Sequence, residues 1–274
     1  MRARLASVFI LIFLSYKAYT QVLVGPVAGF NYSWTSFGDK DLKSQYRVTP
    51  VMGYHIGGHL AFKVRKRFFL HTSLIYSTKG KDMTRRGKDV SNDPEGLALK
   101  LKYNYIEMPL VYTAYFKGTI GTKSFKYSLG IGPNVSYWLG GKGTFENGDT
   151  HEFHGGDSYV IPVKIKFGKD PATAQETDMV IQHPNRIQLG LNFTAGFLFE
   201  PARDREMVLT LRYELGHSYL SRESNGVFGP EFRSFSETQK IRNQGFRISL
   251  AYLIDLKVEE RKKGKSTIDR RRPK

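Results

Sequence analysis

The side chains that could carry out chemistry in this 274-residue chain are histidines, serines and acids, because it contains no cysteine. Without cysteine there is no thiolate nucleophile, no thiolate metal site and no disulfide. A Ser–His–acid set could still support a hydrolase, but it depends on mutual hydrogen bonds that a sequence does not show. The candidates are His151, His154, Asp157, Ser158, His183 and His217.

No recognised motif supports these candidates. The chain has no GxSxG, and the run from His151 to His154 lacks the HExxH spacing that places two metal ligands on one helix face. We therefore expect no catalytic residue, no metal site and no cofactor, and we expect that the protein is not an enzyme.

A second polar set lies inside segments that are otherwise apolar. Its charged members are Glu107, Arg212, Glu214 and Arg247. Because buried charges must be paired, we expect the two arginines, on adjacent strands, to engage the two glutamates. The set would then be a structural plug, in preference to a proton or substrate pathway. The other inward candidates are His55, His59, His71, Gln188 and Asn192.

The segments that must position this set alternate with a period of two, most clearly from Arg186 to Glu200. Successive side chains of a strand point to opposite faces. One parity would face lipid and comprises Ile187, Leu189, Leu191, Phe193, Phe197 and Phe199; the other would face the interior and comprises Gln188, Gly190, Asn192, Thr194 and Gly196. The length also suits a tilted strand that crosses a hydrocarbon layer.

Seven further segments have a similar alternation, which makes about eight strands. They are Val22 to Ser33, Val51 to Val64, Phe68 to Tyr76, Leu99 to Phe116, Lys123 to Leu139, Met207 to Leu215 and Phe246 to Leu256. In Leu99 to Phe116 the apolar residues change parity midway. That change predicts a β-bulge near Tyr105 to Pro109.

The connections alternate between short and long. Short ones follow the second, fourth and sixth strands: Arg65 to Arg67, Lys117 to Thr122 and Pro201 to Glu206. Long ones follow the odd-numbered strands: Trp34 to Pro50, Lys79 to Ala98, Gly140 to Asn185 and Ser218 to Gly245. Outer-membrane barrels have short periplasmic turns and long outside loops. We therefore predict an all-β fold, an eight-stranded antiparallel transmembrane β-barrel with long extracellular loops, over a secreted sandwich or a lipocalin-like barrel.

The third long connection contains strand-like runs of its own, Tyr159 to Phe167 and Met179 to Gln182. We expect them to form a hairpin that stands off the barrel, either as a binding surface or as a cap over its mouth. A neutral surface decoration is an equal alternative.

The two ends of the chain read as separate segments. Residues 1–20 combine a basic start, an apolar run too short to span a membrane as a helix and a stretch with small residues before Gln21, which is the layout of a secretory signal peptide. We predict a signal peptide at 1–20, the barrel at 21–256 and a basic periplasmic tail at 257–274, with both termini periplasmic. Removing residues 1–20 takes away three bases and lowers the formal net charge from +17 to +14.

The basic residues concentrate on the predicted periplasmic side. Bases and acids nearly balance in the long connections, whereas the tail has nine bases and three acids. We expect no nucleic-acid partner, because no recognition motif is present. The expected partners are outer-membrane lipid and, through the tail, an acidic periplasmic or secretion-machinery protein. A solvated, disordered tail is the alternative.

Five segments resemble the PorT-like outer-membrane β-barrel family of Bacteroidota. They are VGPVAGFNYS at 24–33, YNYIEMPLVYTAYF at 103–116, GIGPNVSYWLGG at 130–141, LRYELGHSYL at 211–220 and NQGFRISLAYLI at 243–254. The resemblance implies a non-enzymatic binding or assembly role in the cell envelope, linked to type IX protein secretion. The extended third connection and the charged tail depart from the family's pattern. Passive passage of a small ligand or ion, or an outer-membrane hydrolase, are the alternative functions.

Overall fold

A computed structural model of the chain describes residues 21–89, 93, 95–120, 123–147, 160–175, 177–202, 205–223, 225–228 and 236–256. The predicted signal peptide at 1–20 and the predicted tail at 257–274 lie outside these residues, as do His151, His154, Asp157 and Ser158. Those predictions therefore stay predictions. No helix within the described residues is long and apolar enough to cross a membrane.

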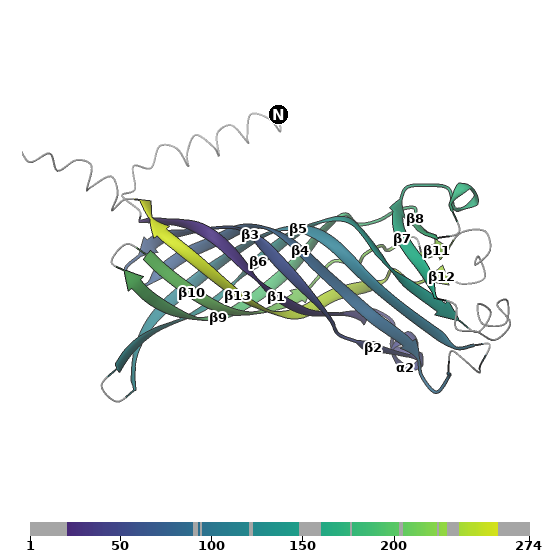
Figure 1. The fold of residues 1–274 in the computed structure, drawn as a ribbon, viewed down its shortest axis with the longest axis horizontal. Helices are drawn as coiled ribbons and strands as arrows, with labels where there is room; N and C mark the ends of the chain where they lie inside the picture. The colour runs from purple at the N-terminus through teal and green to yellow at the C-terminus, as the bar shows by residue number, and fades with distance from the viewer. Residues whose placement is uncertain are drawn as a thin grey trace, which may run out of the picture.

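Eight long strands form a closed antiparallel ring (Figure 1). In ring order they are β1 (Val22–Phe37), β3 (Val51–Arg65), β4 (Phe68–Arg85), β5 (Leu97–Ile120), β6 (Lys123–Asn147), β9 (Ile187–Ala202), β10 (Arg205–Gly216) and β13 (Ile241–Asp255). The pairings of β6 with β9 and of β1 with β13 close the ring. Each predicted strand corresponds to one member of the ring, so the eight-stranded barrel is confirmed.

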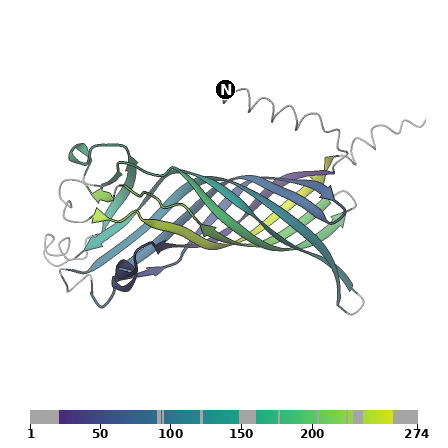
Figure 2. The same ribbon diagram turned by 180° about the vertical axis from the view of Figure 1, so that it is seen from behind.

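The two ends of the barrel differ. The short-turn end carries the connections from β3 to β4, from β5 to β6 and from β9 to β10. The first and last strands of the ring also meet here, where Gln21 donates a hydrogen bond of 2.6 Å to Asp255. At this end β5 and β6, of 24 and 25 residues, project beyond the other strands (Figures 1 and 2). The opposite, long-connection end carries the other connections.

The outer surface of the barrel is apolar between its ends. On β9, Ile187 and Phe193 are 65% and 43% exposed, whereas Gln188 and Asn192 are buried in the interior. The same alternation holds around the ring, where exposed aliphatic and aromatic side chains face outward from every long strand. A continuous apolar outer band with a polar interior is the arrangement that a lipid-embedded barrel requires.

The predicted change of phase in β5 is wrong. Leu101, Tyr103, Tyr105 and Glu107 all point inward, so the inward parity never changes. What changes is the surroundings: near the short-turn end the outside is apolar and the inside polar, whereas near the long-connection end the inside becomes an apolar core. The apolar residues switch faces although the strand does not.

A bulge does occur beside this point, but on the neighbouring strand. Tyr105 pairs with Trp138 and Asn104 pairs with Gly140, which leaves Leu139 of β6 outside the register. Gly140 has a φ of +153°, a backbone conformation that favours glycine. The bulge therefore rephases β6, so that Phe145 and Trp138 both point into the core despite their odd sequence separation.

The long-connection end is closed by a packed apolar core. Its fully buried side chains include Leu99, Tyr103, Trp138 and Phe145. The small elements at this end are α2 (Lys40–Gln45), β2 (Tyr46–Thr49), β7 (Ile161–Phe167), η1 (Pro171–Thr173), β8 (Asp178–Ile181), β11 (Gly226–Phe228) and β12 (Ser236–Glu237).

The third long connection does not form the predicted hairpin that stands off the barrel. β7 pairs antiparallel with β6, and β8 pairs parallel with β7, so both extend the barrel sheet. Ile161, Val163 and Ile165 of β7 pack into the apolar core. Because the apolar face of β7 must be buried, the segment joins the barrel sheet and does not stand off it.

Candidate functional site: the polar interior of the barrel

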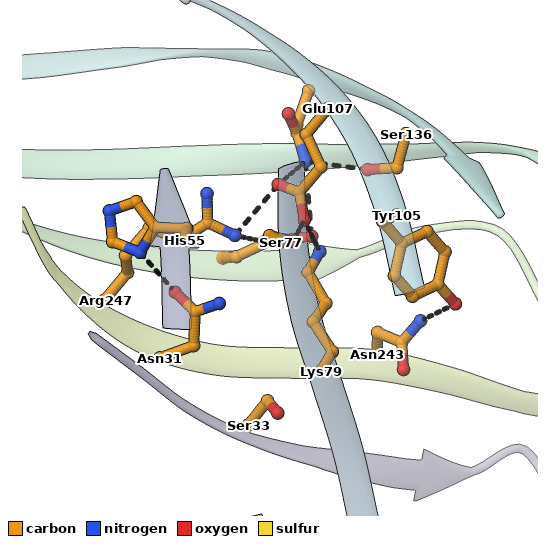
Figure 3. Close-up of polar contacts among 12 residues, drawn as sticks. Asn31, Ser33, His55, Ser77, Lys79, Tyr105, Glu107, Ser136, Asn243 and Arg247 are labelled. Atoms are coloured by element: carbon orange, nitrogen blue, oxygen red, sulfur yellow. Dashed lines mark hydrogen bonds and ion pairs between the residues drawn. The ribbon is translucent and has the colours of Figure 1, made fainter. Parts of the chain in front are cut away.

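Four charged side chains meet inside the barrel, and Figure 3 shows three of them, Lys79, Glu107 and Arg247. Glu107 lies between two cations, with its carboxylate 2.9 Å from Lys79 Nζ and 2.9 Å from Arg247 Nη2. Glu214 contacts the same two cations, and lies 3.6 Å from Arg247 Nη2. We call Lys79, Glu107, Glu214 and Arg247 the ion cluster. It contains two acids and two bases, and all four side chains are buried.

Neutral donors complete the hydrogen bonds of the two carboxylates. Ser77 donates to Glu107, and the side-chain amide of Asn134 lies 3.4 Å from Glu107 and 3.3 Å from Glu214. The ammonium group of Lys79 also lies 5.2 Å from the centre of the Tyr105 ring. Their mutual attraction and these hydrogen bonds offset the desolvation penalty of the buried charges.

The membership of the ion cluster differs from the sequence prediction in two residues. The structure brings Arg247 to Glu107 and Glu214, but within the described residues it gives Arg212 no ion pair. Lys79 takes the place that was expected for Arg212, although Lys79 was predicted to lie in a loop. The strand β4 runs to Arg85, and Lys79 continues the inward parity of His71, Ser73 and Ser77. That parity was the signal that could have found it.

Three histidines are also buried in the interior: His55 lies beside the ion cluster, and His59 and His71 contact each other. His59 Nε2 is 2.9 Å from His71 Nδ1, and His71 Nε2 is 3.1 Å from the hydroxyl of Tyr115. His59 also contacts Ser73, at 2.7 Å. His55 contacts Asn31 and Ser249, each at 2.8 Å. Each ring is therefore a member of an internal hydrogen-bond network.

Residues 17–221, about three quarters of the chain, match the family described as Outer membrane protein beta-barrel domain. The chain belongs to this family. No curated protein sequence matches it.

Solved structures of other outer-membrane proteins are similar to this family member at low identity. OprG from Pseudomonas aeruginosa is 10% identical, with 86% of this chain and 94% of that chain covered and a TM-score of 0.44. Neisserial surface protein A is 10% identical, with 86% and 97% covered and a TM-score of 0.35. Ail of Yersinia pestis is 12% identical, with 85% and 98% covered and a TM-score of 0.30.

At the short-turn end the outer-membrane barrel opens into a cavity of about 930 Å³, which we call the vestibule. Four aromatic side chains and six bases line it together with three acids. The bases are Lys63, Lys66, Arg67, Lys117, Lys126 and Arg205; the acids are Glu200, Glu206 and Asp255. Of the acids, Glu200 pairs with Lys126 and Asp255 accepts from Gln21. The vestibule is therefore a cationic chamber.

The loop histidines of this outer-membrane barrel form no site that the structure shows. His183 and His217 are exposed. Within the described residues, no group of three or more His, Asp or Glu side chains is arranged to hold a metal ion.

A second buried ion pair lies in the core of the long-connection end, between Lys81 of β4 and Glu237 of β12. Their side chains are 0% and 2% exposed. It attaches the fourth long connection to the barrel wall, and sequence reading missed it because it placed both residues in loops.

Removing both charges of this pair is expected to change the stability of the barrel only slightly. In the double variant Lys81→Met/Glu237→Gln, the free energy of unfolding should stay within about 1–2 kcal/mol of wild type, because neither charge is left alone. Each single variant should be less stable than the double. Urea unfolding of the refolded barrel measures all four proteins. A double variant less stable than both singles would contradict the pairing.

Proposed function

We propose that this outer-membrane barrel is non-conducting and non-enzymatic and acts by binding or assembly in the cell envelope. The ion cluster supports this function most directly. Its four charged side chains are buried inside the barrel and paired with one another, and the apolar core lies beyond them toward the long-connection end. An eight-stranded barrel has an interior that side chains can just fill.

We place the short-turn end in the periplasm and the long-connection end outside the cell. Outer-membrane barrels have short periplasmic turns and long outer loops, and an even strand number leaves both termini on the periplasmic side. The vestibule and the basic tail at 257–274 would then face periplasmic components.

The role we propose in finer detail is that of a PorT-like component of envelope assembly, linked to type IX secretion. Its support is the sequence resemblance, together with a basic tail suited to an acidic periplasmic protein. The full chain, purified from its native membrane under mild detergent, should retain a secretion-machinery protein. Deleting residues 258–274 should reduce that retention, and replacing the nine bases of the tail with Gln should reduce it equally.

Two results would contradict these proposals. Unchanged co-purification and phenotype after the tail deletion would leave the tail as a solvated segment without a partner. Stepwise ion currents from the wild-type barrel in a planar bilayer would replace the non-conducting role with passive passage of ions or small ligands.

A further inference from the structure

Arg212 is a buried cation without a partner. Its side chain points into the barrel from β10 and the residue is 6% exposed. Its Nε and Nη1 atoms have no hydrogen-bond acceptor among the described residues, and no carboxylate of those residues lies within ion-pair distance. An uncompensated buried charge is strongly unfavourable, so a stable barrel requires something to offset it.

Glu107 and Glu214 attract Arg212 from beyond ion-pair distance, but these two acids already balance two other cations. The ion cluster is neutral by itself, because Glu107 and Glu214 balance Lys79 and Arg247. Arg212 is paired across the sheet with Arg247, a second cation. The polar interior near mid-height therefore has one positive charge too many, which is the charge that a single monovalent anion would neutralise.

A cavity beside Arg212 could hold such an anion. It has a volume of about 30 Å³, which exceeds the roughly 10–15 Å³ that one water needs. Its lining includes Arg212 and the hydroxyl side chains of Thr113, Ser128, Thr194 and Thr210. Hydroxyl groups can donate a hydrogen bond to an anion, and no acidic side chain lines the cavity.

The cavity also lies next to a source of anions. Tyr115 lines both this cavity and the vestibule, so the two adjoin at this side chain. The excess of bases over acids in the vestibule raises the local concentration of anions. An anion would therefore enter from the short-turn end.

We propose that the barrel binds one small monovalent anion, of the size of chloride or bromide, between Arg212 and the threonine hydroxyls of this cavity. The anion completes the charge balance of the interior and is bound only by the folded barrel. Binding to the folded state alone makes stability rise with the concentration of the anion.

The test is urea unfolding of the purified mature barrel in non-ionic detergent, followed by tryptophan fluorescence. Sodium chloride or sodium bromide is compared with sodium gluconate at equal ionic strength. The urea midpoint should be higher in either halide than in gluconate and should rise with halide concentration. Crystals soaked in bromide should show an anomalous peak beside Arg212.

Variants separate this site from general effects of salt. Arg212→Met should lose the halide-dependent shift, and in gluconate it should unfold at a urea concentration at least equal to that of wild type, because the unpaired charge is gone. Arg85→Met, at the opposite end of the barrel, should keep the shift. If Arg212→Met does not fold, Thr194→Val/Thr210→Val retains the arginine but should reduce the shift.

Three outcomes would overturn the proposal. One is a wild-type midpoint that is the same in chloride, bromide and gluconate. Another is an Arg212→Met barrel that keeps the full shift. The third is a bromide-soaked crystal without an anomalous peak beside Arg212.

Discussion

Replacing Glu107 with Gln should lower the free energy of unfolding by about 3–5 kcal/mol, the range observed when one partner of a buried ion pair is removed. Gln has nearly the same shape, so the change removes charge and little packing. Lys79 and Arg247 would then share only Glu214, and the interior would gain one uncompensated positive charge. Urea unfolding in detergent or lipid vesicles, read by the heat-modifiable mobility of the folded barrel on gels, measures the loss.

The matched control is Glu95→Gln at the long-connection end. Glu95 also faces two cations, Arg85 at 3.4 Å and Lys88 at 3.6 Å, but its side chain is 58% exposed. Exposed pairs contribute only about 0–1 kcal/mol. Equal costs for the two variants would mean that the ion cluster is not buried as described. The Glu107→Gln barrel should also remain non-conducting in bilayers, and a new ion current in that variant would refute the structural plug.

Placing arginine at Phe193 should cost about 2–4 kcal/mol, the range for a basic residue on the lipid face at the bilayer midplane. Phe193 points outward from the middle of β9 and pairs with Ile131 of β6 and Tyr213 of β10. All three side chains belong to the outer surface, so the guanidinium would have to enter hydrocarbon or bend away toward the interface. Reversible folding into vesicles, with urea as denaturant, measures the cost.

Two control variants place arginine near the membrane interface and outside the membrane. Phe199→Arg makes the same chemical change on the same face of β9 but close to the short-turn end, and should cost about 0–1 kcal/mol. Gln182→Arg, at an exposed position just after β8, should cost little. If Phe193→Arg were as well tolerated as these two, the outward face of β9 would not be the lipid face.

The parity of the strands shows how much could be read from the sequence. Alternation placed Gln188 and Asn192 of β9 inside and Ile187 and Phe193 outside, and the structure has them there. Alternation predicts the faces correctly because the pleat of a strand sends neighbouring side chains to opposite faces, whatever the rest of the fold. The regular sequence of short and long connections then predicted that the eight strands close into a ring.

The alternation rule gave a wrong prediction for β5, because the surroundings of this strand change along the barrel axis. In β5 the apolar residues pass from the outer face to the inner face between Ile106 and Tyr105, and this looked like a change of strand phase. The strand is regular, but its outer face passes from the apolar band to solvent-facing residues such as Lys102 and Lys100. Sequence shows which side chains share a face, and not what that face meets.

For the chemistry of the interior, the sequence by itself determined which charged residues point inward from recognised strands: Glu107, Arg212, Glu214 and Arg247. Only the tertiary structure decided which of them meet. Contact across the barrel depends on how the strands are placed relative to one another around the ring, which no local pattern encodes. That is why Lys79 joins the ion cluster, Lys81 binds Glu237, and Arg212 is left with a cavity in place of a carboxylate.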